Sequence, residues 1–184
     1  MADIIRDTDY SLDNEPWYAV RTYNKQEKKV TDFFNRRSLY NFIPMRFSDE
    51  FTDEEIPQRI LVPAIHNLVF LKKSLPQKEI VGLLRECPVP VSPIRRTDTR
   101  ELYEIRNRDM TEMRVLCDPK CKASIFSMPD NGEMTVGQAV RIVAGPFKGF
   151  TGHLVRVSKK YYFVKSVAGL GVMLRTSRWY CEPM

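Results

Sequence analysis

Residues 139–157 read AVRIVAGPFKGFTGHLVRV, and they carry the clearest structural pattern in the C-terminal part of the chain. An apolar segment is followed by a short glycine-rich turn and then by a second apolar segment, which predicts two strands joined tightly. Pro146 fixes the turn and Lys148 is left at its exposed tip. Three glycines supply the backbone freedom that such a turn needs: Gly145, Gly149 and Gly152.

The rest of this part continues with the same short period. Strands are predicted at residues 161–167 and 172–174, with turns at 158–160 and 168–171 and no helical pattern between them. A small all-β unit has edge strands that must be protected, and closure of the sheet is the simplest protection. Residues 134–184 are therefore predicted to form a small all-β barrel.

The N-terminal part mixes strands and helices. An aromatic and β-branched strand is predicted at residues 17–23, and Asn24 with Glu27 resembles a capping box that begins a helix. This order predicts an α+β domain over residues 15–116, a sheet with helices packed on it. Further strands are predicted at 40–47, 60–62 and 68–71, an extended segment at 89–94, an acidic turn at 48–55, and helices at 75–85 and 107–116.

Two segments lack a regular pattern. Residues 1–14 are acidic and poor in large apolar side chains, so a disordered tail is predicted there. Residues 117–133 contain Pro119, Pro129 and the turn sequence Asp-Asn-Gly, so this stretch is predicted to be a linker. The chain is thus expected to hold two domains, at residues 15–116 and 134–184.

Charge is distributed unevenly along the 184 residues, whose net charge is +6. Residues 1–14 carry one basic and four acidic residues, and residues 15–133 carry 20 basic and 18 acidic ones. Residues 134–184 carry eight basic residues against one acidic residue, a net charge of +7. This excess predicts a polyanionic partner for the barrel. A basic surface that serves solubility alone is the alternative.

Composition also bounds the class of protein. The hydrophobic fraction of 43% is enough for a buried core. No apolar run long enough to cross a membrane and no secretory signal are visible, so a cytoplasmic protein without membrane association is expected.

Catalytic chemistry has little support in the sequence. The two histidines, His66 and His153, belong to no recognisable catalytic constellation, and no phosphate-binding glycine loop is present. Neither an enzyme nor a cofactor is expected. Cys117 and Cys121 have the spacing of half a zinc site, which leaves a metal-dependent enzyme as an alternative. Because the other cysteines, Cys87 and Cys181, are isolated, free thiols are predicted.

Both parts of the chain resemble one family. Residues 139–157 resemble the KOW motif of the SH3-like barrels in NusG-type transcription factors and some ribosomal proteins. Residues 17–22, followed at once by a basic helix, resemble the start of the NusG N-terminal (NGN) domain. At residues 65–68 the sequence Ile-His-Asn-Leu departs from the family's usual Pro-Gly-Tyr turn. This departure indicates a specialised paralogue, and the overall pattern is similar to the UpxY-type antiterminators of capsular polysaccharide operons.

The resemblance, which covers about residues 15–184, implies a transcription elongation or antitermination factor. In that family the NGN domain docks on the clamp helices of RNA polymerase and bridges the cleft, which suppresses pausing and termination. The KOW barrel, free on its linker, contacts a second partner such as a ribosomal protein, a termination factor, DNA or RNA. A monomer is expected. The alternative is an RNA-binding or ribosome-associated KOW protein.

Motif position assigns the candidate site residues. Those expected to bind RNA polymerase are Trp17, Arg21, Tyr23, Ile65, His66, Asn67 and Leu68. For Trp17 and Leu68, burial in the core is an equal alternative. Lysines of the first helix could face DNA or form a solvated face, namely Lys25, Lys28 and Lys29. On the barrel, phosphate contacts or a solvated rim are the alternatives for Lys148, Arg156, Lys159 and Lys160.

Overall fold

The computed structural model describes residues 14–51, 57–121, 123–127, 137–167 and 170–184. The described residues form two compact units, the first ending at Met110 and the second beginning at Thr111. The predicted acidic tail lies outside the described residues apart from position 14. Among the described residues, no helix combines the length and the apolar composition needed to cross a bilayer.

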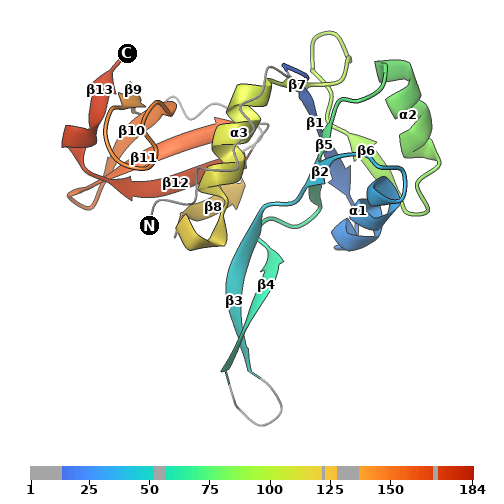
Figure 1. The fold of residues 1–184 in the computed structure, drawn as a ribbon, viewed down its shortest axis with the longest axis horizontal. Coiled ribbons are helices and arrows are strands. Elements are labelled where there is room, and N and C mark those ends of the chain that lie inside the picture. Colours follow the sequence, from blue (N-terminus) through green and yellow to red (C-terminus); the bar gives the residue numbers. More distant parts are fainter. Residues whose placement is uncertain (1–13, 52–56, 122, 128–136, 168–169) are drawn as a thin grey trace. The chain divides into compact units, whose positions relative to one another are not determined.

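The N-terminal unit is built on an antiparallel sheet (Figure 1). Its strand order is β2-β5-β1-β6, and β7 also pairs with β1. The central strand β1 is almost wholly buried because it has neighbours on both sides, and its register with β5 places Arg21 opposite Leu68. The strands are β1 (Trp17–Thr22), β2 (Asn41–Phe42), β5 (Leu68–Lys72), β6 (Val91–Pro93) and β7 (Glu104–Ile105).

Two helices, α1 (Glu27–Asn35) and α2 (Gln77–Arg85), pack against this sheet. Tyr18 of β1 lies in one buried cluster with Phe34 of α1 and Ile80 of α2. Burial of these large apolar side chains is the main source of stability for the unit. A third helix, α3 (Asn107–Leu116), begins in the first unit and ends in the second. The predicted helices at 75–85 and 107–116 are confirmed, the first beginning two residues late after Pro76.

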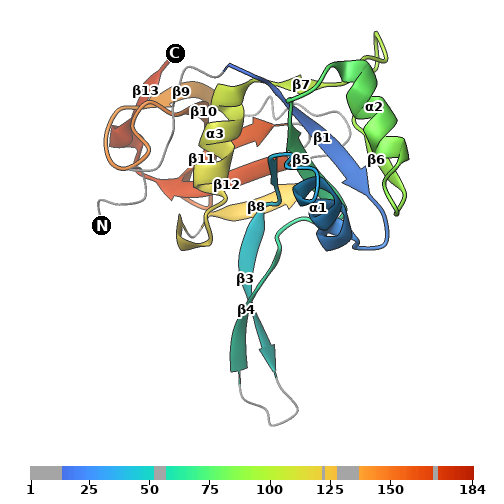
Figure 2. The ribbon, with the colours of Figure 1, turned by 45° about the vertical axis from the view of Figure 1, so that its right-hand side comes forward.

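A separate hairpin of β3 (Met45–Phe51) and β4 (Pro57–Pro63) projects from the five-stranded sheet (Figure 2). The predicted strand at 40–47 is divided, because β2 ends at Phe42 and β3 begins at Met45. Pro44, which has no backbone N–H to donate, lies at the break. The predicted acidic turn at 48–55 is wrong in its first part, since β3 continues to Phe51 in register with β4. Residues 52–56 lie outside the described residues.

The C-terminal unit contains a six-stranded antiparallel sheet of order β13-β9-β10-β11-β12-β8. The strands predicted from residues 139–174 correspond to β9, β10, β11 and β12. The α+β domain and the all-β unit that the sequence predicted are thus both confirmed. The strands are β8 (Ser124–Ser127), β9 (Gln138–Ile142), β10 (Thr151–Val157), β11 (Lys160–Val167), β12 (Leu170–Thr176) and β13 (Cys181–Pro183).

Three elements of this unit were not predicted. β8 lies inside residues 117–133, where the sequence predicted a linker, and it pairs with β12. The same stretch holds a short 3-10 helix, η1 (Pro119–Cys121). After β12, a second 3-10 helix, η2 (Arg178–Tyr180), leads into β13, which pairs with β9. β8 and β13 are only four and three residues long, so neither carries an alternation that a sequence pattern could detect.

Close packing inside the hairpin of β10 and β11 explains one of the glycines. A Cβ atom added to Gly152 would lie 2.4 Å from the carbonyl oxygen of Val164 and 2.7 Å from the ring of Phe163. The two strands are joined by Ser158 and Lys159, with φ values of 48° and 66°. Two consecutive residues with positive φ between paired strands form a type I′ turn, which matches the twist of the hairpin.

Candidate functional site

Two turns of the N-terminal unit meet at one end of its sheet. The first joins β1 to α1 at residues 23–26, and the second joins β4 to β5 at residues 64–67. Asn67 links them, because its carbonyl oxygen accepts the backbone N–H of Thr22 at 3.0 Å and its side-chain Oδ1 accepts that of Lys25 at 2.9 Å. These two segments are referred to below as the paired turns.

Glu27, the first residue of α1, completes the link. Its side chain is buried, and its carboxylate accepts the backbone N–H of Asn67. The Nδ1 atom of His66 lies 3.6 Å from the same carboxylate oxygen. The capping box predicted from Asn24 to Glu27 is therefore wrong. The N-cap of α1 is Gln26, without a side-chain cap, and Glu27 bonds to the other turn instead of to its own helix. A carboxylate in the first helical turn also interacts favourably with the positive end of the helix dipole.

The backbone of the paired turns is tightly wound. Asn24, Lys25 and Asn67 have φ values of 56°, 55° and 64°, all in the left-handed region. Asparagine enters this region more readily than most residues other than glycine. Asn67 thus provides the backbone conformation that the turn needs, together with a side-chain acceptor that glycine lacks.

Five of the seven residues predicted to bind polymerase gather here. Arg21, Tyr23 and His66 are exposed, whereas Ile65 and Asn67 are half-buried. Tyr23 is 44% exposed, although tyrosine is a large aromatic residue. The side chains of Tyr23, Ile65 and His66 are exposed or half-buried. These three residues are referred to below as the turn surface.

The other two predicted residues, Trp17 and Leu68, lie in the core. Trp17 is 1% exposed and Leu68 is 8% exposed. The indole Nε1 of Trp17 donates to Oδ1 of Asn107 at 2.9 Å, and its ring meets that of Tyr40 edge-on with the ring centres 5.4 Å apart. For these two the structure favours the core interpretation, because their contacts are already made within the N-terminal unit.

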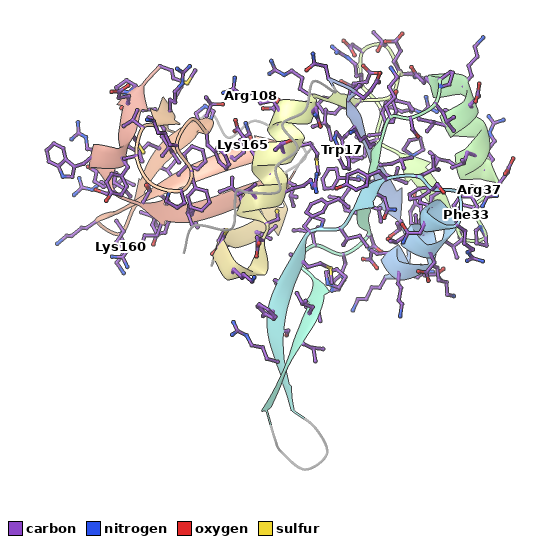
Figure 3. The ribbon with its side chains drawn as sticks, viewed as in Figure 1. Trp17, Phe33, Arg37, Arg108, Lys160 and Lys165 are labelled. Carbon is purple, nitrogen blue, oxygen red and sulfur yellow. The ribbon has the colours of Figure 1, made fainter. Side chains whose placement is uncertain are left out.

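The predicted cationic residues are all exposed, and they lie on several different elements. Lys25 lies in the paired turns, whereas Lys28 and Lys29 lie on α1. Lys148 lies in the turn between β9 and β10. The remaining three, Arg156, Lys159 and Lys160, lie at or beside the turn between β10 and β11. The guanidinium of Arg156 is 5.5 Å from the ring centre of Tyr161. Figure 3 labels Lys160.

The cysteines do not assemble a metal site within the described residues. Burial raises the pKa of the Cys117 thiol to about 12, and the nearby Cys121 adds to this effect. Burial also raises the pKa of Cys121. Both shifts disfavour the thiolate form that zinc binds. In the described part of the chain, no three His, Cys, Asp or Glu side chains are grouped so that they could hold a metal ion.

Two features of interest are not predicted from the sequence. The pattern assigns Glu27 to a helix cap, since a sequence pattern cannot distinguish bonding within the helix from bonding to a distant turn. Trp179, which is 89% exposed on η2, is not among the predicted site residues. The signal for it was present: an adjacent Trp and Tyr that follow the last predicted strand.

Comparisons with known proteins agree with the two-part architecture. Residues 15–114 match the NusG family model, described as transcription termination factor nusG, and residues 136–165 match the KOW motif. Among solved structures, the MjSpt4:Spt5 complex in conformation B is 14% identical, with 91% of this chain and 96% of that chain covered and a TM-score of 0.28. The comparison with curated proteins gave no match. Since the NusG model covers more than half of the chain, this protein belongs to the NusG family and is a transcription elongation factor with a NusG domain followed by a KOW motif.

Proposed function

We propose that the chain binds RNA polymerase through its N-terminal domain and bridges the clamp, so that pausing and termination are suppressed. The observation that carries this proposal is the turn surface, on which Tyr23, Ile65 and His66 are presented by two turns that are hydrogen-bonded to each other. The buried carboxylate of Glu27 stabilises this arrangement by accepting the backbone N–H of Asn67.

Physical reasoning favours such a surface for protein recognition. Tyrosine offers a large apolar ring with a polar tip and is enriched where interfaces gain most of their affinity. Because the paired turns are fixed by hydrogen bonds before binding, little conformational entropy is lost when a partner docks. The exposed Lys28 and Lys29 on the neighbouring helix add positive charge that favours approach to nucleic acid near the polymerase.

The C-terminal unit is proposed to recruit a second partner. A tethered second contact acts at a high effective concentration, so two weak contacts together hold the factor on a transcribing enzyme. The turn at Asn67, which replaces the family's usual Pro-Gly-Tyr sequence, fits a specialised regulator of long operons such as capsular polysaccharide loci. An RNA-binding or ribosome-associated KOW protein is the second candidate, and the charge of +7 on residues 134–184 favours it.

A pull-down of purified RNA polymerase by the full-length chain tests the first proposal. Tyr23→Ala and His66→Ala are expected to lower retention with little change in melting temperature, since both side chains are exposed. His153→Ala changes the other histidine of the chain, in the C-terminal unit, and serves as the matched control. No retention of polymerase by the unmodified chain would sink the proposal. Transcription through a terminator, with and without the protein, separates suppression of termination from its stimulation.

A further inference from the structure

The end of the chain carries large apolar side chains that the fold does not cover. Trp179 is 89% exposed, Tyr180 is 49% exposed and Met184 is 68% exposed. Leaving an indole in water forgoes the free energy that its burial would supply. Adjacent exposed aromatic residues of this kind mark interaction sites more often than isolated ones do. Trp179 and Tyr180 are called the aromatic pair below.

The aromatic pair is held on an ordered frame. The backbone N–H of Tyr180 donates to the carbonyl oxygen of Ser177 at 3.0 Å, which closes η2. The carbonyl oxygen of Tyr180 accepts the N–H of Val143 at 2.8 Å, and Cys181 pairs with Ile142 where β13 joins β9. The indole is therefore presented to solvent by a backbone that is fixed on both sides.

Two exposed cationic residues, Lys148 and Arg178, belong to the segments attached to this frame. The turn that carries Lys148 is attached to the same strand, because the N–H of Gly149 donates to the carbonyl oxygen of Ile142 at 2.7 Å. The turn with Lys148 and the aromatic pair are thus bonded to two consecutive residues, Ile142 and Val143. Arg178 is exposed next to Trp179. The one acidic residue of residues 134–184, Glu182, lies opposite Arg141 across the pairing of β13 with β9.

We propose that the aromatic pair is a stacking site for unpaired bases of single-stranded RNA, with Arg178 and Lys148 placed to meet its phosphates. An aromatic face among cations suits a strand that presents flat bases and negative charge together. A protein partner that buried the pair would have to desolvate these cations as well. Duplex RNA keeps its bases stacked on one another, so it cannot use the site. The choice of RNA rests on the proposed function, since a transcribing polymerase releases a single strand of RNA.

The two tryptophans of the chain make a direct test possible. Trp17 is buried in the N-terminal unit, so a change in tryptophan emission on adding RNA reports mainly on Trp179. The full-length protein is titrated with an oligouridine of about 12 nucleotides, within the site sizes of single-strand binders. The expected result is quenching that saturates with oligouridine and is absent with duplex RNA of the same length. Oligodeoxythymidine of that length is titrated in parallel and is expected to bind no more tightly.

Variants separate stacking from simple charge attraction, with fluorescein-labelled oligouridine as the probe. Trp179→Ala is expected to weaken binding by about fivefold or more, the loss expected for one stacked base, and Trp179→Phe to restore part of it. Arg178→Gln is expected to reduce the slope of log affinity against log salt by about one. Arg85→Gln, at an exposed arginine of α2, is the matched control and leaves both quantities unchanged.

Several outcomes overturn the assignment. Equal binding of duplex RNA, unchanged affinity in Trp179→Ala, or tighter binding of oligodeoxythymidine each contradicts a stacking site for RNA. Absence of quenching does so as well, and it would leave a protein as the partner of this surface. Retention of polymerase by Trp179→Ala is measured in parallel and is expected to match the unmodified chain. Failure of RNA binding with intact retention therefore rejects this inference alone, whereas loss of retention by the unmodified chain rejects the proposed function.

Discussion

The ammonium of Lys165 and the carboxylate of Glu112 lie 2.9 Å apart, with side chains that are 7% and 4% exposed. Lys165 belongs to β11 and Glu112 to α3, and the same carboxylate accepts the backbone N–H of Thr151 at 3.3 Å. Removing two charges from water is costly unless they are paired and hydrogen-bonded. The pair therefore fixes the second half of α3 to the C-terminal sheet. This agrees with a compact unit that begins at Thr111, whereas the sequence placed the end of the first domain at residue 116.

Breaking this pair from one side is expected to destabilise the C-terminal unit. Glu112→Leu removes the carboxylate that lies 2.9 Å from the buried Lys165 ammonium, at a cost of about 3–5 kcal/mol in the free energy of unfolding. Chemical denaturation followed by circular dichroism measures the loss. Because Lys165 is almost fully buried, salt is expected to change the result little.

The double variant Glu112→Leu with Lys165→Met is the control for that prediction. Both charges are then absent and the volumes are roughly kept, so most of the stability is expected to return. A double variant as unstable as the single one would show that the shape of the side chains, and not their charge, governs stability here.

Asn67 is expected to matter through both its backbone and its side chain. Asn67→Ala puts alanine, which enters the left-handed region less readily than asparagine, at a φ of 64° and removes the acceptor for Lys25, so a loss of about 1–3 kcal/mol in unfolding free energy is expected. Asn67→Gly keeps the conformation and loses only the acceptor, so a smaller loss is expected. Retention of polymerase should fall in the same order, because the paired turns carry the turn surface. Equal stability of the two variants would show that the left-handed backbone is not the main factor.

The sequence predicted elements well where a pattern was long or a turn was specific. The helix at residues 107–116 was predicted with its observed bounds, because its apolar residues repeat at helical spacing. The hairpin of β10 and β11 matches the short strands predicted on either side of a turn at residues 158–160. β8 and β13 were missed, since a strand of three or four residues forms only because a neighbouring edge is available.

Motif position selects candidate residues without showing which of them are accessible to a partner. Tyr23 and His66, selected in this way, lie in the paired turns and are exposed, whereas Trp17, selected by the same reasoning, lies in the core. The sequence pattern around a strand residue is the same whether its side chain faces a partner or the protein interior. The bond from Asn67 to Glu27 joins residues 40 positions apart, and only the fold brings them within reach.

Deprotonation of Tyr18 is expected to lower the unfolding free energy at alkaline pH. Its hydroxyl donates to Oε1 of Glu104 at 3.0 Å, and burial, followed by this bond, raises the pKa of Tyr18 from 10.0 to about 12. Between these values the unfolded chain has lost the tyrosine proton while the folded chain keeps it. Stability from this group is therefore complete below pH 10 and is lost as the pH rises towards 12. Tyr18→Phe is expected to show a shallower fall in unfolding free energy between pH 9 and pH 11 by urea denaturation; parallel curves would contradict the assignment.

Two glycines offer opposite outcomes for the same substitution. A Cβ atom at Gly152 would lie 2.4 Å from the carbonyl oxygen of Val164, a backbone atom that can move only if β10 and β11 separate. Gly152→Ala is therefore expected to lower the unfolding free energy of the C-terminal unit by about 1–3 kcal/mol.

At Gly82, inside α2, a Cβ atom would meet nothing within 4 Å. Gly82→Ala is expected to stabilise the N-terminal unit by about 0.5–1 kcal/mol, since alanine favours the helix. Amide hydrogen exchange measures the stability of each unit separately, so each substitution is expected to change exchange only in its own unit. Faster exchange in β10 and β11 of Gly82→Ala would contradict this expectation.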